Sequence, residues 1–144
     1  MNSFLRHTFL RHTVATLAFR FRKAVKDAPE GFGDVRAGGR SATETVAHMG
    51  DLFDWALRHC DGVSEWREAT PQNWEAECER FLTTLAAFDQ RIQAEILCPA
   101  EKLFQGPVAD ALTHVGQLGT LRRVAGAPAA PKNYFKAEIE AGVI

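Results

Sequence analysis

Cysteine is scarce in this sequence, which holds only Cys60, Cys78 and Cys98 among 144 residues. Three is an odd number, and no pair of these cysteines has the CxxC spacing. The pattern therefore matches neither a disulfide framework nor a zinc ribbon. We expect reduced thiols that pack as small apolar groups. The alternative, a cysteine nucleophile paired with a histidine, has no local signature here.

Long hydrophobic runs and an excess of positive charge are also absent. No apolar stretch approaches the ~18–20 residues of a membrane-spanning helix, and basic residues such as Arg6, Arg11 and Arg20 interrupt any signal-peptide core. The 17 Lys and Arg nearly balance the 18 Asp and Glu, which gives a formal charge of −1. Nucleic-acid-binding proteins are usually basic. We therefore expect a cytoplasmic protein with neither a nucleic acid nor a membrane as partner.

Several common catalytic and binding motifs are missing. The sequence contains no GxSxG, GxGxxG, Walker A, HExxH or EF-hand pattern. These absences argue against the common hydrolases, dinucleotide and nucleotide enzymes, zincins and calcium-binding proteins.

What is present is helical periodicity. Apolar residues recur at spacings of three and four nearly throughout, without alternating runs, and this predicts helices rather than strands. Capping patterns and turn residues mark the ends of the helices. The first expected helix has an apolar face from Leu10 to Val25 and ends at Pro29 and Gly31, and the second runs from the Ser41-Ala42-Thr43-Glu44 capping box to about Cys60. The third and longest runs from Thr70-Pro71 to about Leu97, and the fourth from near Pro107 through Arg123. A short last helix, which Asn133 caps, contains Phe135 and Ile139.

The length and these helices together predict the fold class. A chain of this size buries about two thirds of its surface on folding, so that it needs no metal or disulfide merely to form a core. Four amphipathic helices close most simply around one apolar core, with the glycine-rich segment Gly31–Arg40 as a crossover. We predict an all-α single domain over residues 1–144, a four-helix bundle with a short extra C-terminal helix.

Three polar residues fall on helical faces that are otherwise apolar. Asp110 and His114 lie four positions apart on the fourth helix, on the same face. His48 lies on the inward stripe of the second helix. Two imidazoles and one carboxylate from facing helices make a three-ligand site that suits Zn, Ni or Fe. The alternative is a carboxylate–imidazole hydrogen bond beside an ordinary core histidine.

Two segments resemble a known group of proteins. They are SATETVAHMGDLFDWAL, residues 41–57, and ADALTHVGQL, residues 109–118. Both are similar to the DinB-like superfamily, which includes the DinB and YfiT-like proteins and the mycothiol-dependent maleylpyruvate isomerases. The resemblance extends from about residue 41 to Gly142. It implies a four-helix bundle, often a homodimer, with a divalent metal ion bound inside.

The resemblance also assigns roles to single residues. His48 matches the ligand of the second helix, and His114 matches the ligand that precedes Gly-Gln. Asp110 occupies the remaining ligand position, where many relatives have histidine and the maleylpyruvate isomerases have a carboxylate. Asp51 and Gln117 are candidates for orienting the ligands.

The thiol-dependent branch of this group suggests a function. The metal would bind a low-molecular-weight thiol as thiolate and activate it for attack on an electrophilic small-molecule substrate, as in a transferase or isomerase. Arg80, Arg122 or Arg123 are candidates for holding an anionic substrate. The alternative function is a non-catalytic bundle that binds a metal or small ligand, or a structural homodimer.

Overall fold

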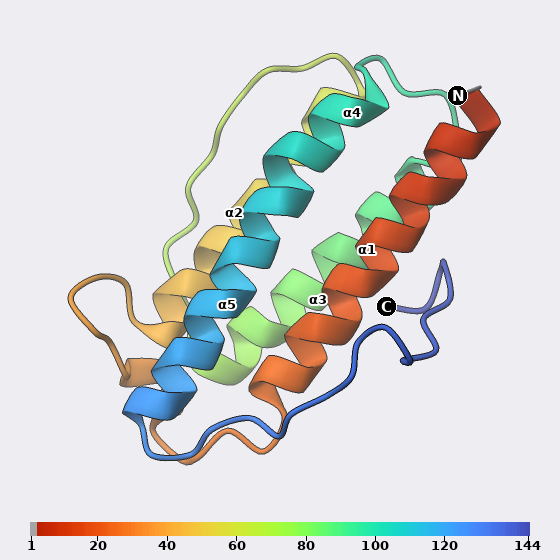
Figure 1. The fold of residues 1–144 in the computed structure, drawn as a ribbon. Coiled ribbons are helices and arrows are strands. Elements are labelled where there is room, and N and C mark those ends of the chain that lie inside the picture. Colours follow the sequence, from red (N-terminus) through yellow and green to blue (C-terminus); the bar gives the residue numbers. More distant parts are fainter. Residues whose placement is uncertain (1–2) are drawn as a thin grey trace.

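The computed structural model describes residues 3–144 and shows four helices packed side by side (Figure 1). These are α1 (Ser3–Val25), α2 (Ala42–Cys60), α3 (Trp74–Arg91) and α5 (Ala109–Val124). A short helix α4 (Ala100–Leu103) and a π-helical turn (Phe104–Val108) lead into α5, and a 3-10 turn (Phe32–Asp34) lies between α1 and α2. The described residues contain no strand. The predicted all-α four-helix bundle is confirmed.

The capping box at the start of α2 has the predicted hydrogen bonds. The backbone N–H of Glu44 donates to Ser41 Oγ, and the backbone N–H of Ser41 donates to Glu44 Oε1, each at 3.1 Å. These two bonds satisfy N–H groups that have no partner inside the helix. Sequence and structure agree here because both partners lie within four residues of each other.

The third helix is shorter than predicted. Asn73 caps it by accepting from the backbone N–H of Ala76 at 2.9 Å, so α3 begins at Trp74 rather than after Thr70-Pro71. It ends at Arg91 rather than Leu97, because the following segment turns back to α2 and Leu97 N–H donates to the carbonyl of Cys60 at 2.9 Å. The longest helix is α1 with 23 residues, against 18 for α3.

The fourth helical segment begins earlier than predicted and contains a local irregularity. It starts at Ala100 and continues through the π turn, in which Pro107 lies inside the helix. Proline has no N–H to donate, and π-helical turns inside helices occur frequently at functional sites. Ala109 N–H donates to the carbonyl of Phe104. The irregularity therefore ends directly before Asp110.

The C-terminal segment has less helix than predicted. Asn133 does cap it, since Asn133 Oδ1 accepts from the backbone N–H groups of Phe135 and Lys136. The structure beyond the cap is a turn over residues 134–136 and not a regular helix. Phe135 is 97% exposed, so its side chain provides no packing energy that would extend the turn into a helix.

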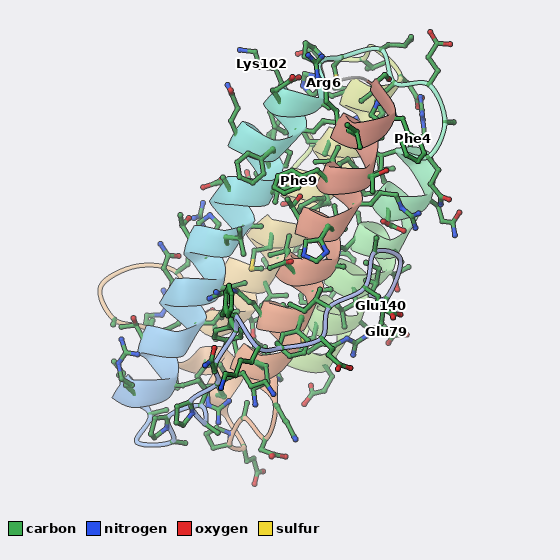
Figure 2. All side chains as sticks on the ribbon, turned by 45° about the vertical axis from the view of Figure 1, so that its right-hand side comes forward. Phe4, Arg6, Phe9, Glu79, Lys102 and Glu140 are labelled. Atoms are coloured by element: carbon green, nitrogen blue, oxygen red, sulfur yellow. The ribbon has the colours of Figure 1, made fainter. Side chains whose placement is uncertain are left out.

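Some apolar side chains remain exposed on the N-terminal half of α1. Phe4 is 76% and Phe9 59% exposed, and Figure 2 shows both on α1. Phe9 and Phe104 line a groove of about 520 Å³ between α1 and the start of the fourth helical segment.

The homodimer expected from the sequence stays a prediction, which a measurement of the mass of the protein in solution will check.

A buried arginine joins the ends of α1 and α5. Arg122 is 4% exposed, and its guanidinium donates to the carbonyls of Ala24, Lys26 and Ala127 at 2.7–2.9 Å. The last carbonyls of a helix lack intrahelical partners and carry partial negative charge. Arg122 therefore satisfies the C-terminal end of α1 and is not free to hold a substrate.

We expect the substitution Arg122→Ala to destabilise the protein by roughly 2–4 kcal/mol, because it leaves the buried carbonyl of Ala24 and the partly buried carbonyls of Lys26 and Ala127 without this donor. Arg123→Ala is the matched control, since Arg123 is exposed at the next position, and should change stability by less than about 0.5 kcal/mol. Urea unfolding followed by circular dichroism measures both. Equal stability of the two variants would contradict the structural role of Arg122.

Candidate metal centre

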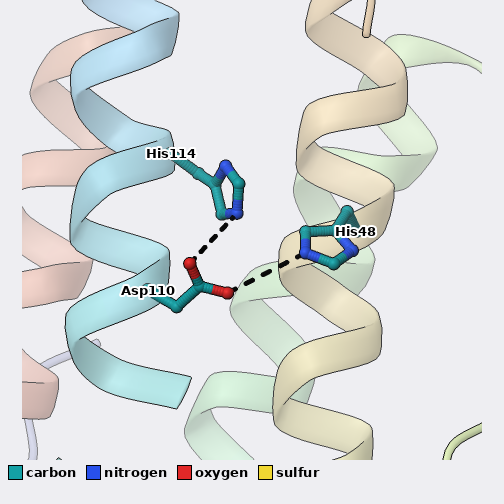
Figure 3. Close-up of side chains that lie close together, drawn as sticks. All are labelled: His48, Asp110 and His114. Atoms are coloured by element: carbon teal, nitrogen blue, oxygen red, sulfur yellow. Dashed lines mark ion pairs between the residues drawn. The ribbon is translucent and has the colours of Figure 1, made fainter. Parts of the chain in front are cut away.

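The three predicted ligand residues meet between α2 and α5. His48 projects from α2, while Asp110 and His114 project from successive turns of α5, and all three side chains point into the same space (Figure 3). One potential ligand atom from each residue lies within 4.8 Å of the other two. Of the residues that the structure describes, this is the group of histidine, cysteine and acidic side chains able to hold a metal ion.

The ligand atoms stand farther apart than in an occupied metal site and would have to move together around an ion. Asp110 Oδ1 lies 3.6 Å from His114 Nε2, and Asp110 Oδ2 lies 4.0 Å from His48 Nε2. Metal–ligand bonds of about 2.0–2.2 Å place neighbouring ligand atoms about 3.3–3.6 Å apart in a tetrahedron. The two imidazole rings are 4.9 Å apart and nearly perpendicular. The donor set of two nitrogens and one oxygen therefore fits a divalent ion.

His114 is held in the orientation that a ligand needs. Its Nδ1 lies 2.8 Å from Gln117 Oε1. Because an amide oxygen only accepts hydrogen bonds, Nδ1 is the donor in this contact, and in a neutral imidazole this leaves the lone pair of Nε2 toward Asp110. His114 is also 7% exposed. Gln117 therefore fixes the orientation of the His114 ring.

His48 is kept neutral by its surroundings. Burial lowers the pKa of its imidazole below the ordinary value of 6.5, and the positive charge of Arg40 acts in the same direction. Asp110 and Glu68 oppose this effect without reversing it. Near pH 7, the imidazole of His48 is therefore neutral where its Nε2 lies 4.0 Å from Asp110 Oδ2. A neutral imidazole is the form that binds a metal.

Two hollows adjoin His48. One, of about 560 Å³, is lined by Trp55 and Trp66, together with residues at the start of α5 that include Asp110. The other, of about 400 Å³, is polar and is lined by Arg40 and Glu68. Both hollows therefore give small molecules access to His48.

Trp66 is the site residue that the sequence analysis missed. Its ring centroid lies 5.8 Å from that of His48 and 6.1 Å from that of Trp55. It belongs to residues 63–73, which form no helix or strand. The segment therefore gives no periodicity to interpret. A tryptophan in a polar loop between two helices was the only available signal.

Asp51 does not orient a ligand as expected. Its carboxylate accepts from the guanidinium of Arg80 at 3.2 Å and from the backbone N–H of Ala69 at 3.4 Å. Arg80 also donates to Glu77 at 3.0 Å and to the carbonyl of Ala47 at 2.7 Å. Arg80 therefore ties α3 to α2 and is committed to this network rather than to an anionic substrate.

The cysteines behave as the apolar groups that were expected. All three are free thiols. Burial raises the pKa of Cys60 to about 11 and that of Cys78 to about 12, and it also raises the pKa of Cys98. A nucleophile must be a thiolate, so these shifts disfavour the alternative of a cysteine nucleophile.

Comparisons with protein-family models, with curated proteins and with solved structures found no match for this chain. The resemblance to the DinB-like superfamily accordingly stays a prediction from the sequence. Among the described residues, none of the helices has the length and apolar character needed to span a bilayer.

We expect the imidazole of His48 in the metal-free protein to titrate below pH 6.5, because its pKa is lowered chiefly by burial. The variant Arg40→Gln should move the midpoint upward, since it removes a positive charge that opposes protonation. Proton NMR of the imidazole during a pH titration measures both. A midpoint above 6.5 in the unmodified protein would contradict the described environment.

Proposed function

We propose that this protein binds one divalent metal ion through His48, Asp110 and His114 and leaves further coordination positions open. The observation that supports this most directly is the convergence of three ligand atoms from two facing helices within 4.8 Å. A structural zinc site is usually closed by four protein ligands, whereas a reactive site has three and keeps a position for water or substrate. The described group has three.

The ligand types narrow the choice of metal. Imidazole nitrogens suit zinc, nickel and iron, and one added carboxylate oxygen is compatible with each of them. A site for calcium or magnesium would be built mainly from oxygen atoms. We therefore propose Zn, Ni or Fe, among which availability in the cell decides.

We further propose that the site activates a low-molecular-weight thiol for attack on an electrophilic small molecule. The thiol would either be transferred to that molecule or catalyse its isomerisation. A bound divalent ion supplies the positive charge that keeps a coordinated thiol in its thiolate form at neutral pH. The protein's own groups do the remaining work. Gln117 fixes the ring of His114, Asp110 offers a carboxylate that is 47% exposed, and the hollows beside His48 admit the reactants.

Metal binding is the first expected result. After dialysis against metal-free buffer and reloading with Zn, Ni or Fe, the untagged protein should retain about one equivalent per chain by elemental analysis. The variant His114→Ala should lose it, because an ion held by two remaining protein ligands is bound far more weakly. His12→Ala is the matched control, since His12 is an exposed histidine of α1, and it should bind as the unmodified protein does.

Retention of metal by His114→Ala would show that the ion binds elsewhere. No retained metal in any of the three proteins would leave His48, Asp110 and His114 as packing residues. That result would favour the other function considered, a small-ligand-binding bundle or a structural homodimer.

Thiol binding is the second expected result. Addition of 2-mercaptoethanol to the cobalt(II)-loaded protein should produce a new intense near-ultraviolet band, because a thiolate would enter an open coordination position. Methanol at the same concentration is the control and should leave the spectrum unchanged. A cobalt spectrum that does not respond to the thiol would support a closed, non-catalytic metal site.

A further inference from the structure

The larger of the two hollows beside His48 is mostly apolar. Its walls include Leu52 and Trp55 of α2, Ala109 of α5 and Trp66 of residues 63–73, while Gln105 and Thr113 supply neutral polar groups. The volume of about 560 Å³ lies within the range of small-molecule sites, roughly 300–1,000 Å³. This aromatic pocket therefore has the size and lining of a binding site for a small molecule.

Trp66 is held in place although it is 43% exposed. On one side of it, Arg58 Nε donates to the carbonyl of Glu65 at 2.9 Å. On the other side, the backbone N–H of Ala69 donates to Asp51 at 3.4 Å. The loop is thus attached to α2 both before and after Trp66. An aromatic wall fixed in this way loses little conformational entropy when a ligand stacks on it.

The charges around the aromatic pocket restrict the ligand further. Asp110 and His48 are the ionisable residues that line it, and both belong to the proposed metal centre. No lysine or arginine lines it to pair with a carboxylate or phosphate. A cation would meet the positive charge of a bound divalent ion. The lining therefore favours a neutral group.

We infer that the aromatic pocket holds a neutral, flat aromatic group of the substrate against Trp66, with the reacting end of that molecule directed toward His48 and Asp110. This inference rests on the proposed metal centre and adds the substrate class to it. Aromatic rings prefer centroid separations of about 4.5–7 Å, and Trp66 already stands at such separations from both His48 and Trp55.

Two small ligands that coordinate alike separate the contribution of the pocket from that of the metal. Imidazole and 4-phenylimidazole both bind through a ring nitrogen, and the second carries a neutral phenyl arm. Each is titrated into the cobalt(II)-loaded protein while the visible spectrum of the ion is followed. We expect 4-phenylimidazole to bind about three- to tenfold more tightly, which is the range of an added aromatic contact.

The variant Trp66→Ala should bring the ratio of the two affinities close to one and leave cobalt binding unchanged. Trp66→Phe keeps an aromatic wall and should preserve part of the preference. Phe135→Ala is the matched control, because Phe135 is another exposed aromatic residue and lies outside the pocket, and it should keep the full preference. The melting temperatures of the three variants show whether each one folds.

The inference would be overturned if imidazole and 4-phenylimidazole bound equally tightly to the unmodified protein, or if the preference for 4-phenylimidazole survived in Trp66→Ala. In both cases the cobalt spectrum would still support the metal centre. Displacement of bound imidazole by phenyltrimethylammonium at a lower concentration than by 4-phenylimidazole would overturn the neutral character of the ligand. If the unmodified protein shows no bound cobalt at all, the metal centre fails and the inference fails with it. The two failures are therefore distinguishable.

Discussion

The bundle depends on a set of phenylalanine rings buried between α1, α2 and α3. Phe21 of α1 and Phe81 of α3 stand 4.6 Å apart, while Phe53 of α2 contacts both Phe81 and Phe88 at 6.0 and 5.2 Å. All four side chains are fully buried. Such large rings contribute much of the hydrophobic free energy of a core and fix the spacing of its helices. With α2 fixed in rotation, His48 faces His114 and Asp110 of α5.

Polar groups at the margin of this core divide into two kinds. Arg80 and Arg122 are surrounded by carboxylates or carbonyls that use their donors, and each joins two segments that are distant in sequence. The room for Arg80 comes from Gly50, where a Cβ atom would stand 2.8 Å from the guanidinium. His48 and Asp110 differ, because they keep unused lone pairs and border solvent-accessible hollows. Satisfied groups stabilise the fold, and groups with free lone pairs remain available for a ligand.

Local signals predicted some element boundaries and failed at others for a physical reason. The start of α2 was predictable because Ser41 and Glu44 cap each other within one turn. The start of α3 was not, since Thr70-Pro71 and Asn73 both offer a local cap. Residues 63–73 are attached to α2 through Asp51, and the helix begins only after Asn73, whose side chain caps it. The end of α3 likewise depends on a bond from Leu97 to Cys60, a partner on another helix.

The sequence by itself determined that four main helices form, which of their faces are apolar, and that Asp110 and His114 share one face of a helix, because helical periodicity and residue spacing are local properties. That His48 meets this pair depends on how α2 packs beside α5. Tertiary structure alone decided that Asp51 and Arg80 serve the fold and that Trp66 joins the site. The partners of these residues lie on other elements, and a pattern within one segment carries no information about them. The contacts that distinguish a structural polar residue from a functional one form only when the bundle closes.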